Sequence, residues 1–236
     1  MNNNTVLLKI KERLNKLDSN DYTNIEVWQF VEAFNKGMVD LCRENTRGIN
    51  ITREGDEQSI SRIDDLQRLI VDPLKLKLID KGIYYQTLES DWPKNYLRYK
   101  GVDVNIIRDC CPTSKPANFY LGEDSNVTIY LRDVNKKPSY EWGESFLTLT
   151  GNKINLYHDN QFEISEAFLN YYRQPIRIEI AGFIDPYTGL VPLVDVECEF
   201  QDDLIEVFVS KAASIIAGDI ESIQKQRLDS EIEKTN

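Results

Sequence analysis

NLYHDNQFEISEAFLNYYRQPIRIEIAGFIDPYTG, residues Asn155 to Gly189, is the stretch of sequence that decides the fold. It is dense in aromatic and β-branched residues, which favour β-strands, and it contains no recognisable catalytic constellation. We expect strands at 153–157, 167–173 and 177–180, followed by a turn at 185–189 that has proline and glycine at suitable positions. The stretch therefore predicts a β-rich region whose side chains pack and dock.

The sequence before this stretch contains two hairpin signals. Asp80-Lys81-Gly82 separates two segments, 74–79 and 83–88, in a pattern typical of a β-hairpin. Gly151-Asn152 follows a strand expected at 145–150, and this dipeptide suits the positive backbone angles of a two-residue turn. The remaining expectations here are strands at 102–107 and 126–132 and a short helical turn from Trp92-Pro93 to Gly101.

The long helical patterns lie at the two ends of the chain, and Ser61-Arg62-Ile63-Asp64 is a cap for a short helix that should end before Pro73. Apolar residues recur at helical intervals over 5–17, and Thr23-Asn24-Ile25-Glu26 is a capping box that begins a helix ending near Asn45. A third helix begins with Asp202 or Asp203 as its cap, and its apolar stripe weakens at Gly218-Asp219. This order of elements predicts an α+β fold in which N- and C-terminal helices form a bundle with a β-rich central insertion.

We expect residues 1–236 to form a single domain, because no linker divides the chain. Its helical core comprises 1–72 plus 200–222, and its β-rich insertion comprises 73–199. The C-terminal tail, 223–236, has Leu228 and Ile232 as its only apolar residues, too few to offset the entropy of ordering in a lone subunit. We therefore expect this tail to be mobile in the monomer and to become ordered in an assembly.

The composition limits the classes of partner. The chain has 236 residues, 41% of them hydrophobic, and a net charge of −11. An acidic protein is poorly suited to tight DNA binding, which depends on cationic contacts with phosphates, but an acidic wall lets DNA pass without sticking. No apolar run approaches the length of a bilayer span and no signal peptide is visible, so we expect a cytosolic product without membrane contact. The loop at 53–57 is one candidate for lining a DNA channel.

Four cysteines accompany the chain's single histidine. Cys42, Cys110, Cys111 and Cys198 form no C-x-x-C pair, which makes a structural zinc site improbable, and we expect reduced thiols.

No set of residues indicates catalysis. His158-Asp159 is a candidate half of a general-base arrangement, but a turn residue after Tyr157 explains the pair better. Ser210, Ser214 and Thr148 lack a nucleophile elbow, and the carboxylate pairs Asp64-Asp65 and Asp202-Asp203 are explained by their positions at helix starts. No phosphate-binding glycine motif is present. The sequence therefore predicts no catalytic, cofactor-binding or metal-binding residues, no cofactor and no enzyme activity.

Aromatic residues concentrate in the stretch that opens this section. One explanation is the core of a sheet, and the other is a surface that meets a neighbouring subunit, because Tyr, Phe and Arg are enriched at interface centres. The cluster consists of Phe162, Phe168, Tyr171, Tyr172, Phe183 and Tyr187, flanked by Arg173 and Arg177.

Together with RLNKLDSNDYTNIEVWQFVEAFNKG (Arg13 to Gly37) and AASIIAGDIES (Ala212 to Ser222), the opening stretch resembles a structural tail ring protein of crAss-like bacteriophages. The Ala-rich helix with its Gly-Asp step, Ala212 to Asp219, is similar to the end of the tail-tubular adaptor proteins of short-tailed phages. The resemblance implies a non-enzymatic head-to-tail connector subunit in the virion, made in the cytoplasm of a bacterial host. It also implies a homo-oligomeric ring of about twelve copies on the portal protein, in contact with other tail proteins, with DNA passing through the lumen.

A rival from another class is a small binding module that recognises host-surface glycan or serves as a tail-fibre attachment domain. Trp92 and Trp142 are its natural platforms. An exposed tryptophan flanked by polar side chains would favour this rival, whereas a buried one would favour the connector.

Overall fold

The computed structural model describes residues 1–17, 25–47, 66–108, 111–184, 189 and 191–235, and for 15–17, 45–47, 111–112 and 220–235 it describes the backbone alone. Several predicted features lie outside these residues. They are the Thr23 end of the capping box, the loop at 53–57, the Asp64-Asp65 pair, Cys110 and most of the turn at 185–189.

The chain forms two compact units. The helical unit comprises Met1–Arg68 together with Pro175–Asn236, and the sheet unit comprises Leu69–Gln174. Each unit is described by itself below.

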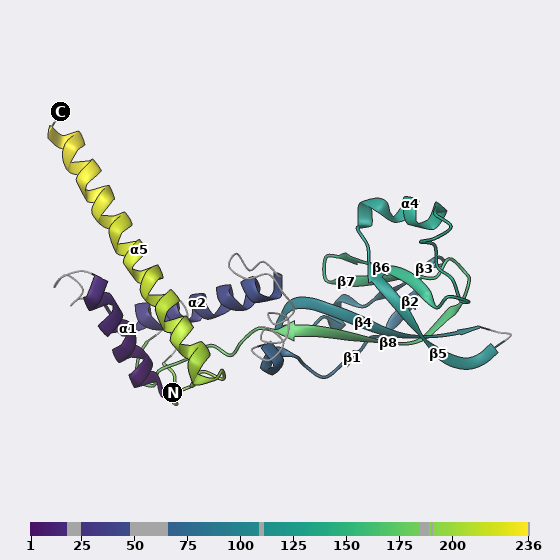
Figure 1. Ribbon diagram of the computed structural model, residues 1–236, viewed down its shortest axis with the longest axis horizontal. Helices are drawn as coiled ribbons and strands as arrows, with labels where there is room; N and C mark the ends of the chain where they lie inside the picture. Colours follow the sequence, from purple (N-terminus) through teal and green to yellow (C-terminus); the bar gives the residue numbers. More distant parts are fainter. Residues whose placement is uncertain (18–24, 48–65, 109–110, 185–188, 190, 236) are drawn as a thin grey trace. The chain divides into compact units, whose positions relative to one another are not determined.

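An eight-stranded sheet, in the order β1-β8-β4-β5-β6-β7-β3-β2, forms the sheet unit (Figure 1). Its neighbouring strands are antiparallel, apart from the parallel pair β5 and β6. The longest strand, β4, lies beside β8, and this pair is in the middle of one half of the sheet. The strands are β1 (Leu74–Lys75), β2 (Leu78–Asp80), β3 (Tyr84–Thr87), β4 (Tyr96–Arg108), β5 (Cys111–Leu121), β6 (Glu144–Thr150), β7 (Lys153–Tyr157) and β8 (Glu163–Arg173).

The predicted fold class, an α+β fold built on a helical bundle with a β-rich insertion, is wrong. The protein is a mixed α/β protein in which the sheet dominates the core. The physical reason is the length of the strands: β4 has 13 residues and β8 has 11, so together they bury a large apolar face. Such a face supports a core of its own and needs no helical bundle beneath it.

Alternation of buried and exposed residues places the core on one face of the sheet. Val102, Val104 and Ile106 of β4 are buried, and Ala167 and Leu169 of β8 are their cross-strand neighbours. The register shifts next to Asn105, where β8 has an extra residue, so its buried positions change from even to odd numbers. This bulge keeps both ends of β8 packed against the same core.

Both predicted hairpins are confirmed. β2 pairs with β3 and β6 pairs with β7, each in antiparallel register. Gly82 and Gly151 occupy the turns with φ values of +98° and +61°, which residues with a Cβ rarely adopt.

The strand expected at 126–132 is wrong, because Val127–Arg132 forms the helix α4. Its Tyr130 packs against Tyr120 and Phe146, with ring centroids 6.1 and 5.2 Å away. A Cβ at Gly122 would lie only 2.8 Å from the Tyr130 ring, so this glycine makes room for it. Aromatic packing has overridden the strand preference of the β-branched residues in this segment.

The strand β5 was not predicted from the sequence. The turn expected to run from Trp92-Pro93 to Gly101 is shorter than predicted, because the N–H of Tyr96 closes it on the Pro93 carbonyl and β4 begins at Tyr96. Two prolines, Pro112 and Pro116, argued against a strand. Both precede Asn118, the residue at which β5 begins to pair with β6. They therefore lie where β5 has a strand on one side alone, a position that tolerates a missing N–H group.

Among its described residues the helical unit has three α-helices: α1 (Asn3–Leu17), α2 (Val27–Arg47) and α5 (Asp202–Thr235). The N-terminal helices confirm the predicted ones closely, and α5 starts at the predicted cap but continues as helix past Gly218. Phe34 of α2 meets Phe208 of α5 edge to face at 5.9 Å, and both side chains are fully buried. Mobility of the tail at 223–236 stays a prediction.

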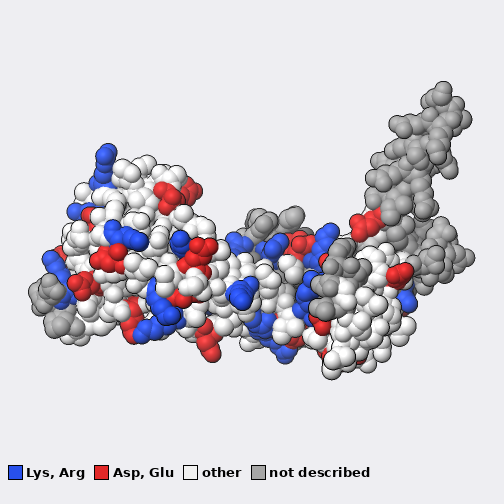
Figure 2. Space-filling view, turned by 180° about the vertical axis from the view of Figure 1, so that it is seen from behind, with Lys and Arg blue, Asp and Glu red and all other residues white. Residues whose placement is uncertain are grey.

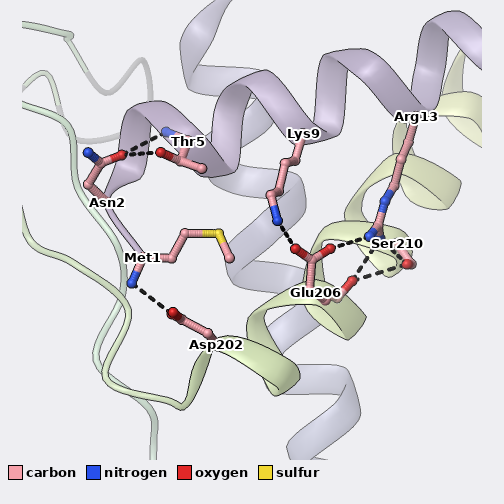
Figure 3. Close-up of polar contacts among 8 residues, drawn as sticks. All are labelled: Met1, Asn2, Thr5, Lys9, Arg13, Asp202, Glu206 and Ser210. Carbon is pink, nitrogen blue, oxygen red and sulfur yellow. Dashed lines mark hydrogen bonds and ion pairs between the residues drawn. The ribbon is translucent and has the colours of Figure 1, made fainter.

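Polar contacts fasten α1 to α5 along one side (Figure 3). Glu206 accepts ion-pair hydrogen bonds from Lys9 and Arg13. The guanidinium of Arg13 also donates to the Glu206 carbonyl at 2.7 Å and to the hydroxyl of Ser210. These bonds fix the register of one helix against the other, while the apolar stripes provide the burial.

Candidate interaction surfaces

The most distinctive surface of the helical unit is formed by residues 179–184 and 191–196, called the arm here. Two backbone hydrogen bonds between Glu179 and Val196, of 3.1 and 2.9 Å, close its base. Further out, the N–H of Gly182 donates to the Pro192 carbonyl at 3.2 Å. The strand expected at 177–180 is thus reduced to a single bridge, and these bonds hold the two segments of the arm to each other.

Two buried asparagines hold the base of the arm. Asn35 of α2 donates to the carbonyl of Ile178 at 3.2 Å and accepts the Ile178 N–H at 2.9 Å, so its amide replaces a neighbouring strand. Asn3 of α1 donates to the carbonyls of Glu179 and Val196 at 2.8 and 3.1 Å. Buried backbone groups need partners, and these side chains provide them where the segment has no strand beside it.

Beyond this base the arm is apolar and exposed. Leu193 is 93% exposed and Val194 is 72% exposed, which are extreme values for large aliphatic side chains. Contiguous exposed apolar surface of this kind marks interaction sites on folded proteins. The exposed apolar side chains of the arm are Phe183, Ile184, Val191, Leu193 and Val194.

The two candidate tryptophan platforms differ. Trp92 is half-buried and packs against Tyr96 with ring centroids 4.5 Å apart. Trp142 is 82% exposed, and its neighbour Glu141 is also exposed. By the criterion set from the sequence, Trp142 favours a binding module and Trp92 does not.

His158 is buried in the sheet unit, in the turn that follows β7, as expected. Its Nδ1 accepts the N–H of Asn160 at 3.2 Å, and its ring lies 4.8 Å from that of Tyr85. Nε2 has no hydrogen-bond partner among the described residues, and the carboxylate of Asp80 lies 3.9 Å away. Burial lowers the pKa of His158 below its ordinary value, although nearby carboxylates oppose that shift. These contacts give His158 a structural environment and bring no nucleophile to it.

The other candidate catalytic side chains form structural hydrogen bonds. Ser210 and Ser214 donate to carbonyls one turn earlier in α5, at 3.1 Å each. Thr148 donates to Asp124 at 3.2 Å. Asp202 and Asp203 stand in the first turn of α5, where the helix dipole favours negative charge.

The aromatic cluster is divided between core and surface. Phe162 and Tyr171 are buried in the core of the sheet, which confirms the first explanation for these two residues. Phe168 and Tyr172 are half-buried. Phe183 belongs to the arm and is 46% exposed, so the second explanation remains open for it.

Cys42 and Cys198 form no disulfide. Burial raises the pKa of Cys42 to about 12, which leaves the thiol protonated and unreactive.

Among the described residues no group of His, Cys, Asp or Glu side chains is arranged to hold a metal ion. None of the helices in the described part of the chain is both long and apolar enough to cross a bilayer.

Charges of both signs are interspersed over the face of the sheet unit that Figure 2 shows. That face carries no continuous basic band of the kind that would hold a nucleic acid backbone.

No protein-family model matches the chain, and no curated protein is significantly similar to it in sequence.

Sequence reasoning missed the arm. Apolar residues such as Leu193 and Val194 carry the same signal whether they end up in a core or on a surface. The one available hint was the pair of prolines at 186 and 192, which are unsuited to a central strand.

Proposed function

We propose that this chain is a non-enzymatic virion subunit that forms a ring in the portal-tail connector of a crAss-like bacteriophage and extends the DNA channel. The proposal rests first on the resemblance of the three segments given above. The net charge of −11 supports it as well, since a lumen of this sign repels passing DNA.

The arm is the single structural observation that carries the proposal. A subunit in a closed ring meets two neighbours through different surfaces, and each surface must be apolar enough to bind. The arm offers such a surface because its apolar side chains, Leu193 and Val194 above all, are exposed while its base is fixed by Asn3 and Asn35. A fixed base reduces the entropy lost when the tip binds a neighbouring copy or the portal protein.

The test is a reconstruction of the tail of purified virions that carry this chain, combined with one charged substitution. The proposed function expects density for the chain that encircles the DNA channel. Leu193→Asp should leave the melting temperature of the isolated subunit unchanged, because Leu193 is 93% exposed, and should remove the chain from particles. Leu8→Asp is the matched control, since Leu8 is also exposed, at 68%, but lies on α1. Density away from the channel, or normal incorporation of Leu193→Asp, would overturn the proposal.

Exposure of Trp142 favours a second candidate function, a small binding module for host-surface glycan or for tail-fibre attachment. The same reconstruction separates the two functions. A module of this kind would occupy the periphery of the tail, and its arm substitutions would leave particle assembly intact.

A further inference from the structure

An open groove of about 420 Å³ lies on the sheet unit, on the face opposite the core. Register determines which side chains share it. Asp103 of β4 is directly opposite Asn118 of β5, and Asn118 is directly opposite Glu144 of β6. These three residues therefore form a row across three strands on one face. Val104, which follows Asp103, is 2% exposed and points into the core on the other face.

Trp142 stands beside this row in a short turn that the backbone holds closed. Ser139 and Glu144 exchange two hydrogen bonds, of 2.9 and 3.2 Å, on either side of the turn. The N–H of Asn118 donates to the Gly143 carbonyl at 2.7 Å, which ties the turn to β5. Gly143 has a φ of +65°, and its neighbour Trp142 is one of the residues that line the groove. The backbone that bears Trp142 is thus held in place before any ligand arrives.

The polar groups of the groove have free hydrogen-bonding capacity. Asp103 accepts one hydrogen bond, from Asn170 to Oδ2 at 2.6 Å, and its other oxygen has no hydrogen bond in the described part of the chain. The side chains of Asn118 and Glu144 are exposed. Together they offer carboxylate acceptors and an amide that both donates and accepts, beside the apolar face of an indole.

The charge of the groove restricts its ligand. Two carboxylates line it and no lysine or arginine does, so phosphates and acidic sugars are repelled. Lys115, the cation of β5, is directly opposite the buried Ile106 and therefore starts from the other face. Its ammonium group is taken up by the Tyr140 ring and by the carbonyl groups of Tyr140 and Glu141, at the turn that precedes Trp142. Single-stranded nucleic acid is disfavoured for the same reason, although its bases stack on aromatic rings.

We propose that this groove binds a neutral saccharide. The apolar face of one pyranose ring stacks on the indole of Trp142, and hydroxyl groups bond to Asp103, Asn118 and Glu144. A volume of about 420 Å³ falls in the range of small-ligand sites, and the groove is open to solvent, so further sugars of a chain can extend out of it. The site does not depend on the proposed ring function, because every residue that forms it belongs to the sheet unit.

The test uses the full chain and saturation-transfer NMR in two arms. The first arm contains maltohexaose, mannotetraose and chitotetraose, and the second contains the polymers dextran and mannan. The proposal expects transfer to at least one neutral saccharide and a shift of the Trp142 indole N–H signal. Binding in the first arm indicates a short free saccharide, whereas binding confined to the second indicates a surface polysaccharide.

Variants assign any binding to the groove. Trp142→Ala and Asn118→Ala should each weaken it about tenfold or more, equivalent to about 1.4 kcal/mol. Ile129→Ala is the matched control, since Ile129 is an exposed residue of the same unit that lies outside the groove, and it should bind as the parent does. Choline serves as the competing probe, because one aromatic ring between carboxylates also attracts a cation. Binding of choline but no saccharide, no binding at millimolar concentrations, or binding unaffected by Trp142→Ala would each overturn the proposal.

Discussion

The two units of this chain differ in how much of the sequence their contacts span. In the sheet unit, one continuous segment supplies every strand, and the ion pair of Lys75 with Glu166 joins residues 91 positions apart. In the helical unit, Lys9 and Glu206 are 197 positions apart, and α5 packs against both N-terminal helices. The comparison teaches that one continuous segment supplies all the residues of the sheet unit, whereas the helical unit is complete only when both ends of the chain are present.

The largest expected effect comes from removing one buried ring in each unit. Phe34→Ala and Phe146→Ala should each cost about 3–5 kcal/mol, because both side chains are fully buried. If the units are independent, each substitution lowers the melting transition of its own unit alone. Calorimetry combined with hydrogen exchange by residue would show this. A single melting transition that both variants shift equally would show that the two units unfold together and are not independent.

A smaller effect is expected from the asparagine that replaces a strand beside the arm. Asn35→Ala leaves the N–H and C=O of the buried Ile178 without partners, which should cost roughly 2 kcal/mol in the helical unit. Asn155 is the control in the sheet unit, because its amide donates to the hydroxyls of Thr148 and Thr150 and to no backbone group. Asn155→Ala should cost about 1 kcal/mol. If urea unfolding shows the same loss of free energy of unfolding for both variants, the hydrogen bonds of Asn35 to backbone groups do not cost more to remove than bonds to side chains.

The third prediction uses the single histidine of the chain, which lies in the sheet unit. Burial lowers the pKa of His158, so the unfolded chain binds more protons than the folded one at mildly acidic pH. The contribution of His158 to the free energy of unfolding is therefore fully present above about pH 6.5, the pKa in the unfolded chain. It is lost as the pH falls from there toward the lower pKa of His158 in the folded state. His158→Gln should remove this dependence. Melting of the sheet unit followed from pH 7.5 to 5 measures it, and a helical unit with the same dependence would argue against the assignment.

The smallest effect is expected from ion pairs on the surface. Glu44→Gln breaks a 2.7 Å pair with Lys211 in the helical unit, and Glu89→Gln breaks a 3.6 Å pair with Lys153 in the sheet unit. Each should cost about 0.2–1 kcal/mol at low salt and less at high salt. A loss above 2 kcal/mol in either unit would mean that the pair belongs to a larger network.

Elements with a strong local pattern could be predicted from the sequence. The helices α1 and α2 follow amphipathic periodicity, and β6 and β7 alternate around a glycine turn. The strand β5 and the helix α4 could not be predicted, because each depends on a distant neighbour. Pro116 is acceptable in β5 because the pairing with β6 starts only at Asn118. The helix α4 is favoured by the packing of Tyr130 over Gly122.

The candidate sites were predictable only in part. The sequence singled out Trp92 and Trp142 as platforms, and of the two only Trp142 is largely exposed. It could not reveal that Asp103, Asn118 and Glu144 share a face with it, since that arrangement requires the register of three strands. Nor could it separate Leu193 from a core leucine, because exposure is a property of the fold.

The packing of α5 against α1 and α2 also has a consequence for synthesis. A ribosome adding about 5–20 residues per second needs on the order of ten seconds or more between the end of α2 and the start of α5. During that interval the apolar stripe around Phe34 has been made but its partner has not. The nascent chain therefore exposes the apolar face of α2 while the sheet unit folds. This interval is the point at which a chaperone would act.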